Sequence, residues 1–408
     1  MNGIVMAGQG GVPRGFVKNY GGHNWAPRFG FAYDPTGSGK TVLRGGFGVS
    51  YVRIQGNDTY SFINNPPNNN STNVYLPPFD DPAAGTILGM GTPNLQAIDP
   101  NYKLPTTYSY SFGIQRELFA NAMLSVAYVG TDAQHLEAAR DINQPLPVPG
   151  YDFDPRLNPA TVPENSLRPY QGFGSIIWEE NTGRSWYNSL QVNFQKRFSH
   201  GLQFQSVYTW SKSEDTGSGF EATPQNSYNW RAEKGLSSYD RPHMLSLNYI
   251  YDLPFFHNAH PLVKGVLGDW EVSGLTIFQS GDIATPTLGI GGGGLATRPN
   301  IIGRVNSGPR TTSEWFNTAA FAMPAAGFFG NAGRDTIRNP GLNQWNFSLM
   351  KKFTLREDMK LQLRFESFNL FNHANYLAPS TGYGSGGFGY ITSAHDPRIL
   401  QFGIKLSF

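Results

Sequence analysis

The stretch "YSYSFGIQ", Tyr108 to Gln115, alternates large apolar side chains with small or polar ones. Its even-numbered positions are Tyr, Phe or Ile, and its odd-numbered positions are Ser, Gly or Gln. Because successive side chains of a strand point to opposite faces, this stretch predicts a β-strand with one apolar and one polar face. The same alternation returns in "SLQVNFQ" (189–195), "MLSLNYIYDL" (244–253), "WNFSLMKKF" (345–353) and "LQLRF" (361–365).

Extending this test along the chain predicts about eleven strands of roughly ten residues each. They are expected to start near Pro27, Thr41, Thr107, Asn121, Trp186, Gly201, Arg241, Trp270, Asn343, Lys360 and Ile399. Short links at 34–40, 117–122, 197–201, 255–269 and 354–358 alternate with long Gly-, Pro- and Asn-rich connections at 55–105, 132–185, 214–240, 281–342 and 372–397. Outer-membrane barrels have short periplasmic turns and long extracellular loops, whereas a soluble β-sandwich has no reason for this asymmetry. The predicted fold is an all-β, antiparallel transmembrane β-barrel.

The composition agrees with this prediction and narrows the function classes. Of 408 residues, 15% are charged and 14% aromatic, and there is no cysteine. Ordinary soluble domains carry about 25% charged residues. Because there is no cysteine, a disulfide framework and thiolate metal sites are excluded. A net charge of +2 without a basic run argues against a nucleic-acid partner. No apolar run approaches the ~18 residues of a spanning helix, and the first residues do not form a signal peptide.

In a barrel, the apolar rows contact lipid and the polar rows line water. Lys196 and Lys351 fall on apolar rows, where a lysine at mid-bilayer costs about 2–4 kcal/mol. Both lie near short turns, so we expect their ammonium groups to snorkel to the periplasmic interface. The alternative is a soluble, glycan-binding β-sandwich whose aromatic residues fill a core.

Several motifs suggest other chemistry but are incomplete. "DPTGSGKT" (34–41) ends like a phosphate-binding loop, but Asp34 replaces its first glycine and a strand follows, so turn chemistry is preferred. "GIGGGG" (289–294) precedes a proline rather than a helix, and "HNAH" (257–260) lacks a third metal ligand. Carboxylates in "SKSEDTGSGFE" (211–221) and "FDDPAAG" (79–85) could bind calcium but are better explained as solvated loops. No catalytic, cofactor-binding or metal-ligating residue is predicted, and the protein is not expected to be an enzyme.

The chain ends in "QFGIKLSF", a strand whose apolar row finishes at the terminal Phe408. This segment resembles the assembly signal of bacterial outer-membrane proteins, in which a polar residue, a glycine and two hydrophobic residues end in a terminal Phe. The matching positions are Gln401, Gly403, Leu406 and Phe408. The resemblance implies that the barrel-assembly machinery recognises them.

Longer stretches resemble one family. They are "APRFGFAYDPTGSGKTVLRGGFGVSY" (26–51), "WFNTAAF" (315–321), "GNAGRDTIRNPG" (330–341) and "RFESFNLFNHANY" (364–376). These segments look like the barrel of TonB-dependent receptors of the Oar-like type, which carry an N-terminal carboxypeptidase-regulatory-like domain. The resemblance implies an outer-membrane transporter with a barrel of about 22 strands and a plug that opens when TonB pulls on it.

Residues 1–408 are expected to be the C-terminal half of such a barrel, without plug, regulatory-like domain or signal peptide. Bacterial barrels have even strand counts. If eleven antiparallel strands closed into a barrel, the first and the last strand would run parallel to each other. The expected function is transport of an unknown solute, such as an oligosaccharide, a peptide or a metal chelate, across the outer membrane of a Gram-negative bacterium. TonB would act only through the missing N-terminal part. The alternative is a surface adhesion or interaction protein that binds through its extracellular loops.

Overall fold

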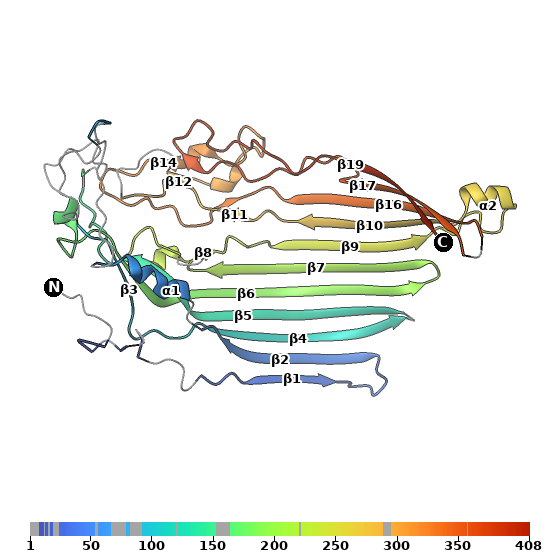
Figure 1. Ribbon diagram of the computed structural model, residues 1–408, viewed down its shortest axis with the longest axis horizontal. Helices are drawn as coiled ribbons and strands as arrows, with labels where there is room; N and C mark the ends of the chain where they lie inside the picture. Colours follow the sequence, from blue (N-terminus) through green and yellow to red (C-terminus); the bar gives the residue numbers. More distant parts are fainter. Residues whose placement is uncertain are drawn as a thin grey trace.

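The computed structural model describes residues 8–11, 13–14, 17–18, 24–53, 56–66, 79–81, 92–119, 121–151, 164–219, 222–288, 295–356 and 358–408. These residues form one large sheet in which eleven strands lie side by side in chain order, each antiparallel to the next (Figure 1). The strands are β1 (Arg28–Tyr33), β2 (Thr41–Tyr51), β4 (Thr106–Phe119), β5 (Ala122–Asp141), β6 (Ile176–Ser199), β7 (Leu202–Asp215), β9 (His243–Asp252), β10 (Trp270–Gln279), β16 (Leu342–Thr354), β17 (Lys360–Phe368) and β19 (Ile399–Ser407). The predicted all-β antiparallel architecture is confirmed.

Ten of the eleven strands start within two residues of the predicted position, but β6 begins at Ile176 rather than near Trp186. The expected length of roughly ten residues is wrong for β5, with 20 residues, and β6, with 24. At about 3.3 Å per residue, β6 extends roughly 80 Å, far more than the ~25 Å apolar band of a barrel. The extra length is supported by neighbours beyond the bilayer, since an Arg140–Glu180 ion pair of 2.9 Å joins the extensions.

Short turns and long loops gather at opposite ends of the sheet, as predicted. The turns that follow β1, β4, β6, β9 and β16 lie at the right of Figure 1, and the C-terminus lies at the same end. The link between β9 and β10 contains the helix α2 (Pro261–Leu267). Since barrels place their short turns in the periplasm, we expect this end to be the periplasmic one.

The long loops contain more regular structure than their composition suggested. Their elements are α1 (Gly56–Tyr60), η1 (Ser61–Asn64), β3 (Leu95–Ile98), η2 (Glu164–Leu167), η3 (Trp230–Glu233), β8 (Gly235–Leu236), β11 (Ile283–Ala284), β12 (Thr287–Leu288), β13 (Asn300–Ile301), η4 (Val305–Ser307), η5 (Thr318–Ala320), β14 (Phe321–Ala322), β15 (Ile337–Arg338) and β18 (Gly382–Tyr383). The prediction of an irregular connection is therefore wrong for 281–342 in particular. Within the described residues, no helix has the length and apolar character needed to traverse a bilayer.

The outer face of the sheet carries the apolar rows. On β19, Phe402 is 77% exposed and Ile404 is 76% exposed, and their neighbours Leu400 and Leu406 are also exposed. A row of exposed Phe, Ile and Leu along one face fits a lipid-facing surface. Contact between this apolar area and water would be unfavourable, and contact with lipid avoids it.

Glycines on the outer face make room for aromatic rings from the neighbouring strand. Tyr110 lies opposite Gly130, and a Cβ on this glycine would collide with the Tyr110 ring. Tyr249 covers Gly274 in the same way. Aromatic rings that cover glycines on the neighbouring strand determine the register of the strand pair, because only glycine leaves the space that the ring occupies.

The sheet does not close on itself. β1 and β19 stand at the two ends of its strand order, and they are not paired with each other. All six residues of β1 are exposed. An unpaired strand leaves backbone N–H and C=O groups available for a further strand.

Candidate functional site

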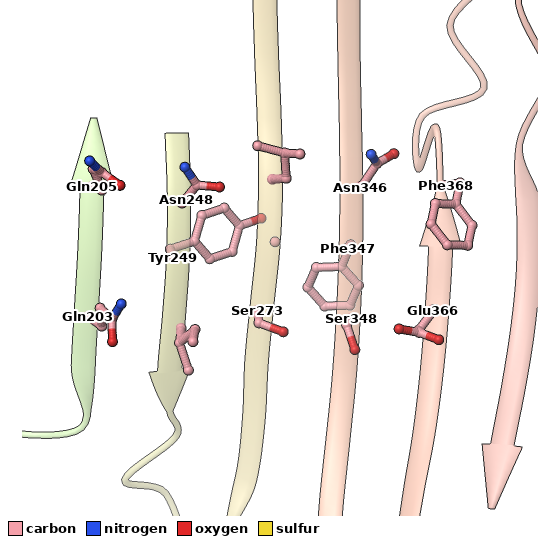
Figure 2. Close-up of a pocket in the computed structure, with 13 residues that line it drawn as sticks. Gln203, Gln205, Asn248, Tyr249, Ser273, Asn346, Phe347, Ser348, Glu366 and Phe368 are labelled. Atoms are coloured by element: carbon pink, nitrogen blue, oxygen red, sulfur yellow. The ribbon is translucent and has the colours of Figure 1, made fainter. Parts of the chain in front are cut away.

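Polar side chains form a hollow on the inner face of the sheet, opposite the apolar rows. Five neighbouring strands, β7, β9, β10, β16 and β17, contribute to this hollow of about 350 Å³, which we call the lumen hollow. Figure 2 shows the polar side chains side by side across these strands. Its polar lining residues are Gln203, Gln205, Asn248, Ser273, Asn346, Ser348 and Glu366.

Strand register explains why these side chains share a face. Gln205 lies opposite Asn248 in the β7–β9 pair, and Ser273 lies opposite Ser348 in the β10–β16 pair. Ser348 is in turn opposite Glu366 on β17. Directly opposed residues of antiparallel strands point to the same side. The polar members of each alternating stretch therefore line up across the sheet.

The polar lining residues of the lumen hollow offer mostly neutral hydrogen-bonding groups, and the apolar side chains of Ile250, Leu275 and Phe368 lie among them. Amides and hydroxyls both donate and accept, so the wall can bind hydroxyl or amide groups of a solute. Glu366 contributes a carboxylate, whose Oε1 lies 3.6 Å from Nη1 of Arg364. This wall suits a solute rich in hydroxyl or amide groups.

A second hollow of about 320 Å³ lies on the inner face near the periplasmic turns of β1–β2 and β4–β5. Its charged and amide-bearing lining residues are Lys40, Arg44, Gln115, Glu117, Asn121, Gln195 and Arg197. Cations outnumber carboxylates in this set, so the inner face carries excess positive charge at this end.

The loops after β10 and β17 pack into a compact structure, the extracellular cap, formed by the described residues 281–288, 295–341 and 372–397. Its core contains Phe316, which is fully buried, and Phe321, Val305 and Ile337. Phe388 from the second loop packs on Phe316 with ring centroids 5.0 Å apart in an edge-to-face geometry. Such pairs are favoured because the positive ring edge meets the negative ring face.

Three arginines of the cap pair with three carboxylates from the end of β7 and from the segment between β7 and β9. The pairs are Arg298–Glu233, Arg334–Asp215 at 2.5 Å and Arg338–Asp240 at 2.8 Å. The three acidic side chains are almost completely buried. Buried charges are tolerated when they are paired and hydrogen-bonded, so these contacts fix the cap on the barrel.

Asp335 extends this charged cluster. Burial raises the pKa of the Asp335 carboxyl above its usual value, while the Thr285 hydroxyl and the Arg334 guanidinium act in the opposite direction. Its Oδ1 accepts a hydrogen bond of 2.9 Å from Thr285. This carboxylate therefore has both a cationic partner and a hydroxyl donor within the cap.

The phosphate-loop-like motif is a turn, as predicted. The carboxylate of Asp34 accepts hydrogen bonds from the backbone N–H groups of Thr36, Gly37 and Gly39, at 2.9, 3.0 and 2.6 Å. The amides that would bind a phosphate are thus bound to the protein's own side chain. Asp34 closes the β1–β2 turn.

The other motifs are placed as follows. Asp215 of "SKSEDTGSGFE" is neither solvated nor arranged for calcium, since it is buried and binds Arg334 and Ser218. His257 Nδ1 pairs with Asp269 at 2.9 Å. In the described part of the chain, no group of three His, Cys, Asp or Glu side chains could hold a metal ion. The motif 289–294 and most of 79–85 lie outside the described residues.

The two lysines on the apolar rows extend to the short turns, as expected, and their ammonium groups bind backbone carbonyls there. Lys196 Nζ donates to the carbonyl oxygens of Ser199 and Leu202, at 2.8 and 2.9 Å. Lys351 Nζ donates to the carbonyl oxygen of Gly268 at 2.5 Å. The periplasmic turns therefore supply the acceptors, and the sequence did not reveal this because the acceptors are backbone groups.

The four residues of the proposed assembly signal lie on β19 or directly after it. Gln401 and Gly403 are on the inner face, opposite Glu366 and Arg364. Leu406 is on the outer face, and Phe408 follows the strand and is 93% exposed. The described structure places them on the terminal strand of the sheet, and their recognition by the assembly machinery stays a prediction.

The fold of the chain is similar to that of solved outer-membrane structures. The chain is similar to the outer membrane transporter YddB from Escherichia coli, with 12% identity and a TM-score of 0.51 over 95% of this chain and 41% of that chain. It is also similar to the pyoverdine outer membrane receptor FpvA from Pseudomonas aeruginosa, with 13% identity and a TM-score of 0.42 over 94% of this chain and 36% of that chain. The chain thus spans less than half the length of these structures. No curated protein sequence matches it.

A family model described as "Outer membrane beta barrel domain" matches residues 1–401, almost the whole chain. This match accounts for the antiparallel sheet, its apolar outer face and its polar inner face. The chain belongs to the outer membrane β-barrel domain family, and its place is the outer membrane of a Gram-negative bacterium.

Proposed function

We propose that the chain forms part of the barrel of a TonB-dependent receptor that carries a solute across the outer membrane. The observation that supports this most is the polar wall of the lumen hollow, built on strands whose opposite faces are apolar. A membrane-spanning wall that is polar on its inner side encloses water or a plug. The resemblance to Oar-like receptors in the quoted stretches supports the same function.

We propose further that the open sheet is the C-terminal half of a barrel of about 22 strands. β1 and β19 would pair with strands supplied by the rest of the receptor, and TonB would act on a plug from that part. Eleven strands in an unclosed sheet, and the likeness to 41% of the YddB structure, support this arrangement. A polar wall of amides and hydroxyls favours an oligosaccharide or a peptide as solute.

Uptake by intact cells tests the transport function. Fluorescent oligosaccharides and peptides are offered to cells with and without the receptor that contains this chain, each with and without TonB. We expect one class to accumulate only when both proteins are present. The triple variant Gln203→Ala, Asn248→Ala, Asn346→Ala should reduce this accumulation about tenfold, while the outer-face control Leu247→Ala should not. Accumulation that is the same with and without TonB would contradict the proposal. So would a failure of both the oligosaccharides and the peptides to accumulate.

The extracellular cap favours one alternative, a surface protein that binds a partner without passing a solute. Its aromatic core and buried ion pairs hold the loops in a defined shape, as a preorganised binding surface needs. The DNA upstream of codon 1 separates the two functions. A plug and a TonB box in frame would favour transport, and a stop codon with its own promoter would favour the surface protein.

A further inference from the structure

The link between β9 and β10, which contains α2, lies at the short-turn end of the sheet (Figure 1) and carries an apolar surface patch. Leu262 is 77% exposed and Val266 is 67% exposed. The complete set, which we call the α2 patch, is Phe255, Phe256, Leu262, Val263, Val266 and Leu267. Soluble surfaces rarely leave so many neighbouring apolar side chains in water, so the α2 patch calls for an occupant.

The sequence of α2 places its apolar residues on one side. Positions 262, 263, 266 and 267 are spaced one and four residues apart, which puts them on a single stripe of a helix with 3.6 residues per turn. Lys264 and Gly265 fall on the other side, and Lys264 is the half-buried residue of the helix. Lys264 therefore faces the protein, whereas Gly265 and the apolar stripe are exposed.

Two side chains from the sheet hold this helix in place. Lys351 Nζ donates to the carbonyl oxygens of Gly268 and Lys264, at 2.5 and 3.3 Å. Trp270 Nε1 donates to the carbonyl oxygen of Val266 at 3.1 Å. A cation at the last carbonyls of a helix is favourable, because it interacts with the negative end of the helix dipole.

The position of these two side chains shows which side of the sheet α2 occupies. Lys351 and Trp270 face each other across β10 and β16. By strand alternation they share the outer row with Leu349 and Val272, which is the lipid-facing row. The α2 patch thus continues the apolar outer surface of the sheet at its periplasmic edge.

We propose that the α2 patch is a membrane anchor that inserts into the phospholipid headgroup and acyl boundary of the periplasmic leaflet. Amphipathic helices with an exposed apolar stripe lie in this boundary, about 5–10 Å deep. The occupant is phospholipid because the patch is continuous with the lipid-facing rows and lies at the short-turn end. Lys351 acts as a clamp that holds the helix on the lipid side. This inference depends on the membrane location and not on transport.

The absence of cysteine allows a direct test, because each single-cysteine variant carries one label. Leu262→Cys and Val266→Cys are labelled with an environment-sensitive fluorophore in protein extracted from outer membranes and returned to phosphatidylethanolamine–phosphatidylglycerol vesicles. Gly265→Cys is the matched control, because a Cβ at Gly265 meets no atom within 4 Å. Heat-modifiable gel mobility checks that each variant is folded.

We expect nitroxide-labelled phospholipid to quench the labels at 262 and 266 at least threefold more than the label at 265, and aqueous iodide to show the reverse order. Adding Lys351→Met to Leu262→Cys should raise iodide quenching at least twofold, because the clamp is lost. Equal iodide quenching at all three positions would overturn the proposal. Protection of 262 and 266 from both quenchers would also overturn it, since it would show a protein partner. Unchanged iodide quenching after Lys351→Met would overturn the clamp.

Discussion

At the scale of single residues, Arg334 connects more of the extracellular cap than its neighbours do. Its guanidinium binds Asp215 and donates to the backbone carbonyl of Glu233. We expect Arg334→Leu to lower the free energy of cap opening by about 3–5 kcal/mol, because it leaves buried carboxylates without their cation. Hydrogen exchange of the amides of residues 213–240 measures this loss.

The control for this variant is Lys212→Leu, which breaks an ion pair with Glu214 whose lysine side chain is 61% exposed. Exposed pairs contribute about 0.2–1 kcal/mol, so the control should change exchange little. Similar exchange in both variants would show that Arg334 is not the residue that holds the cap.

A second prediction concerns the glycine beneath the Tyr110 ring. Gly130→Ala should destabilise the folded protein by about 1–3 kcal/mol, because the added methyl displaces the ring or shifts the strand. Gly48→Ala is the control, because its Cβ would make an ordinary contact of 3.6 Å with Arg28. Urea unfolding in bilayers measures both variants. Equal stability of the two variants would mean that the position of the Tyr110 ring does not require a glycine at 130.

The pH response of the β1–β2 turn depends on Asp34. Backbone N–H groups of Gly39 and Thr36 hold the pKa of its carboxyl below the usual 3.8. A lowered folded-state pKa stabilises the turn above the unfolded-state pKa, and this stabilisation is lost as the pH falls through the folded-state pKa. We therefore expect the Gly39 amide to lose exchange protection in acid, below about pH 4. In Asp34→Asn this acid step should be absent, and an unchanged step would assign it to another group.

At the scale of the strand, alternation predicts which side chains meet lipid. Spin labels placed one at a time at cysteines along β10 should show a period of two in their accessibility. Oxygen, which concentrates in lipid, should reach Val272→Cys more, and a water-soluble nickel chelate should reach Ser273→Cys more. The same accessibility at both positions would contradict the assignment of the two faces.

At the scale of the whole molecule, the open sheet requires partners for its two terminal strands. An unpaired edge next to an apolar outer face favours aggregation. From the proposed half-barrel we expect the detergent-extracted protein to be a polypeptide well above the 45.0 kDa of residues 1–408, with a gel mobility that changes on heating. Mass spectrometry decides this. A heat-modifiable species of 45.0 kDa would contradict the half-barrel and would require pairing between copies of this chain.

The sequence by itself determined the fold class, the number and order of the eleven long strands, and their apolar and polar rows. These features follow from local rules: side chains alternate with a period of two, and Gly, Pro and Asn mark the connections. The turn at Asp34 was predictable for the same reason, since its hydrogen bonds span only five residues.

Only the tertiary structure decided the lumen hollow, the cap and the acceptors of the two lysines. The hollow depends on register across five strands, and the cap joins Arg334 to Asp215, which is 119 residues away in the chain. Lys351 finds its acceptor in the backbone of Gly268, which any residue type would provide. Contacts that depend on long-range register or on backbone groups leave no local pattern in the sequence, so they became visible only when the strands were brought side by side.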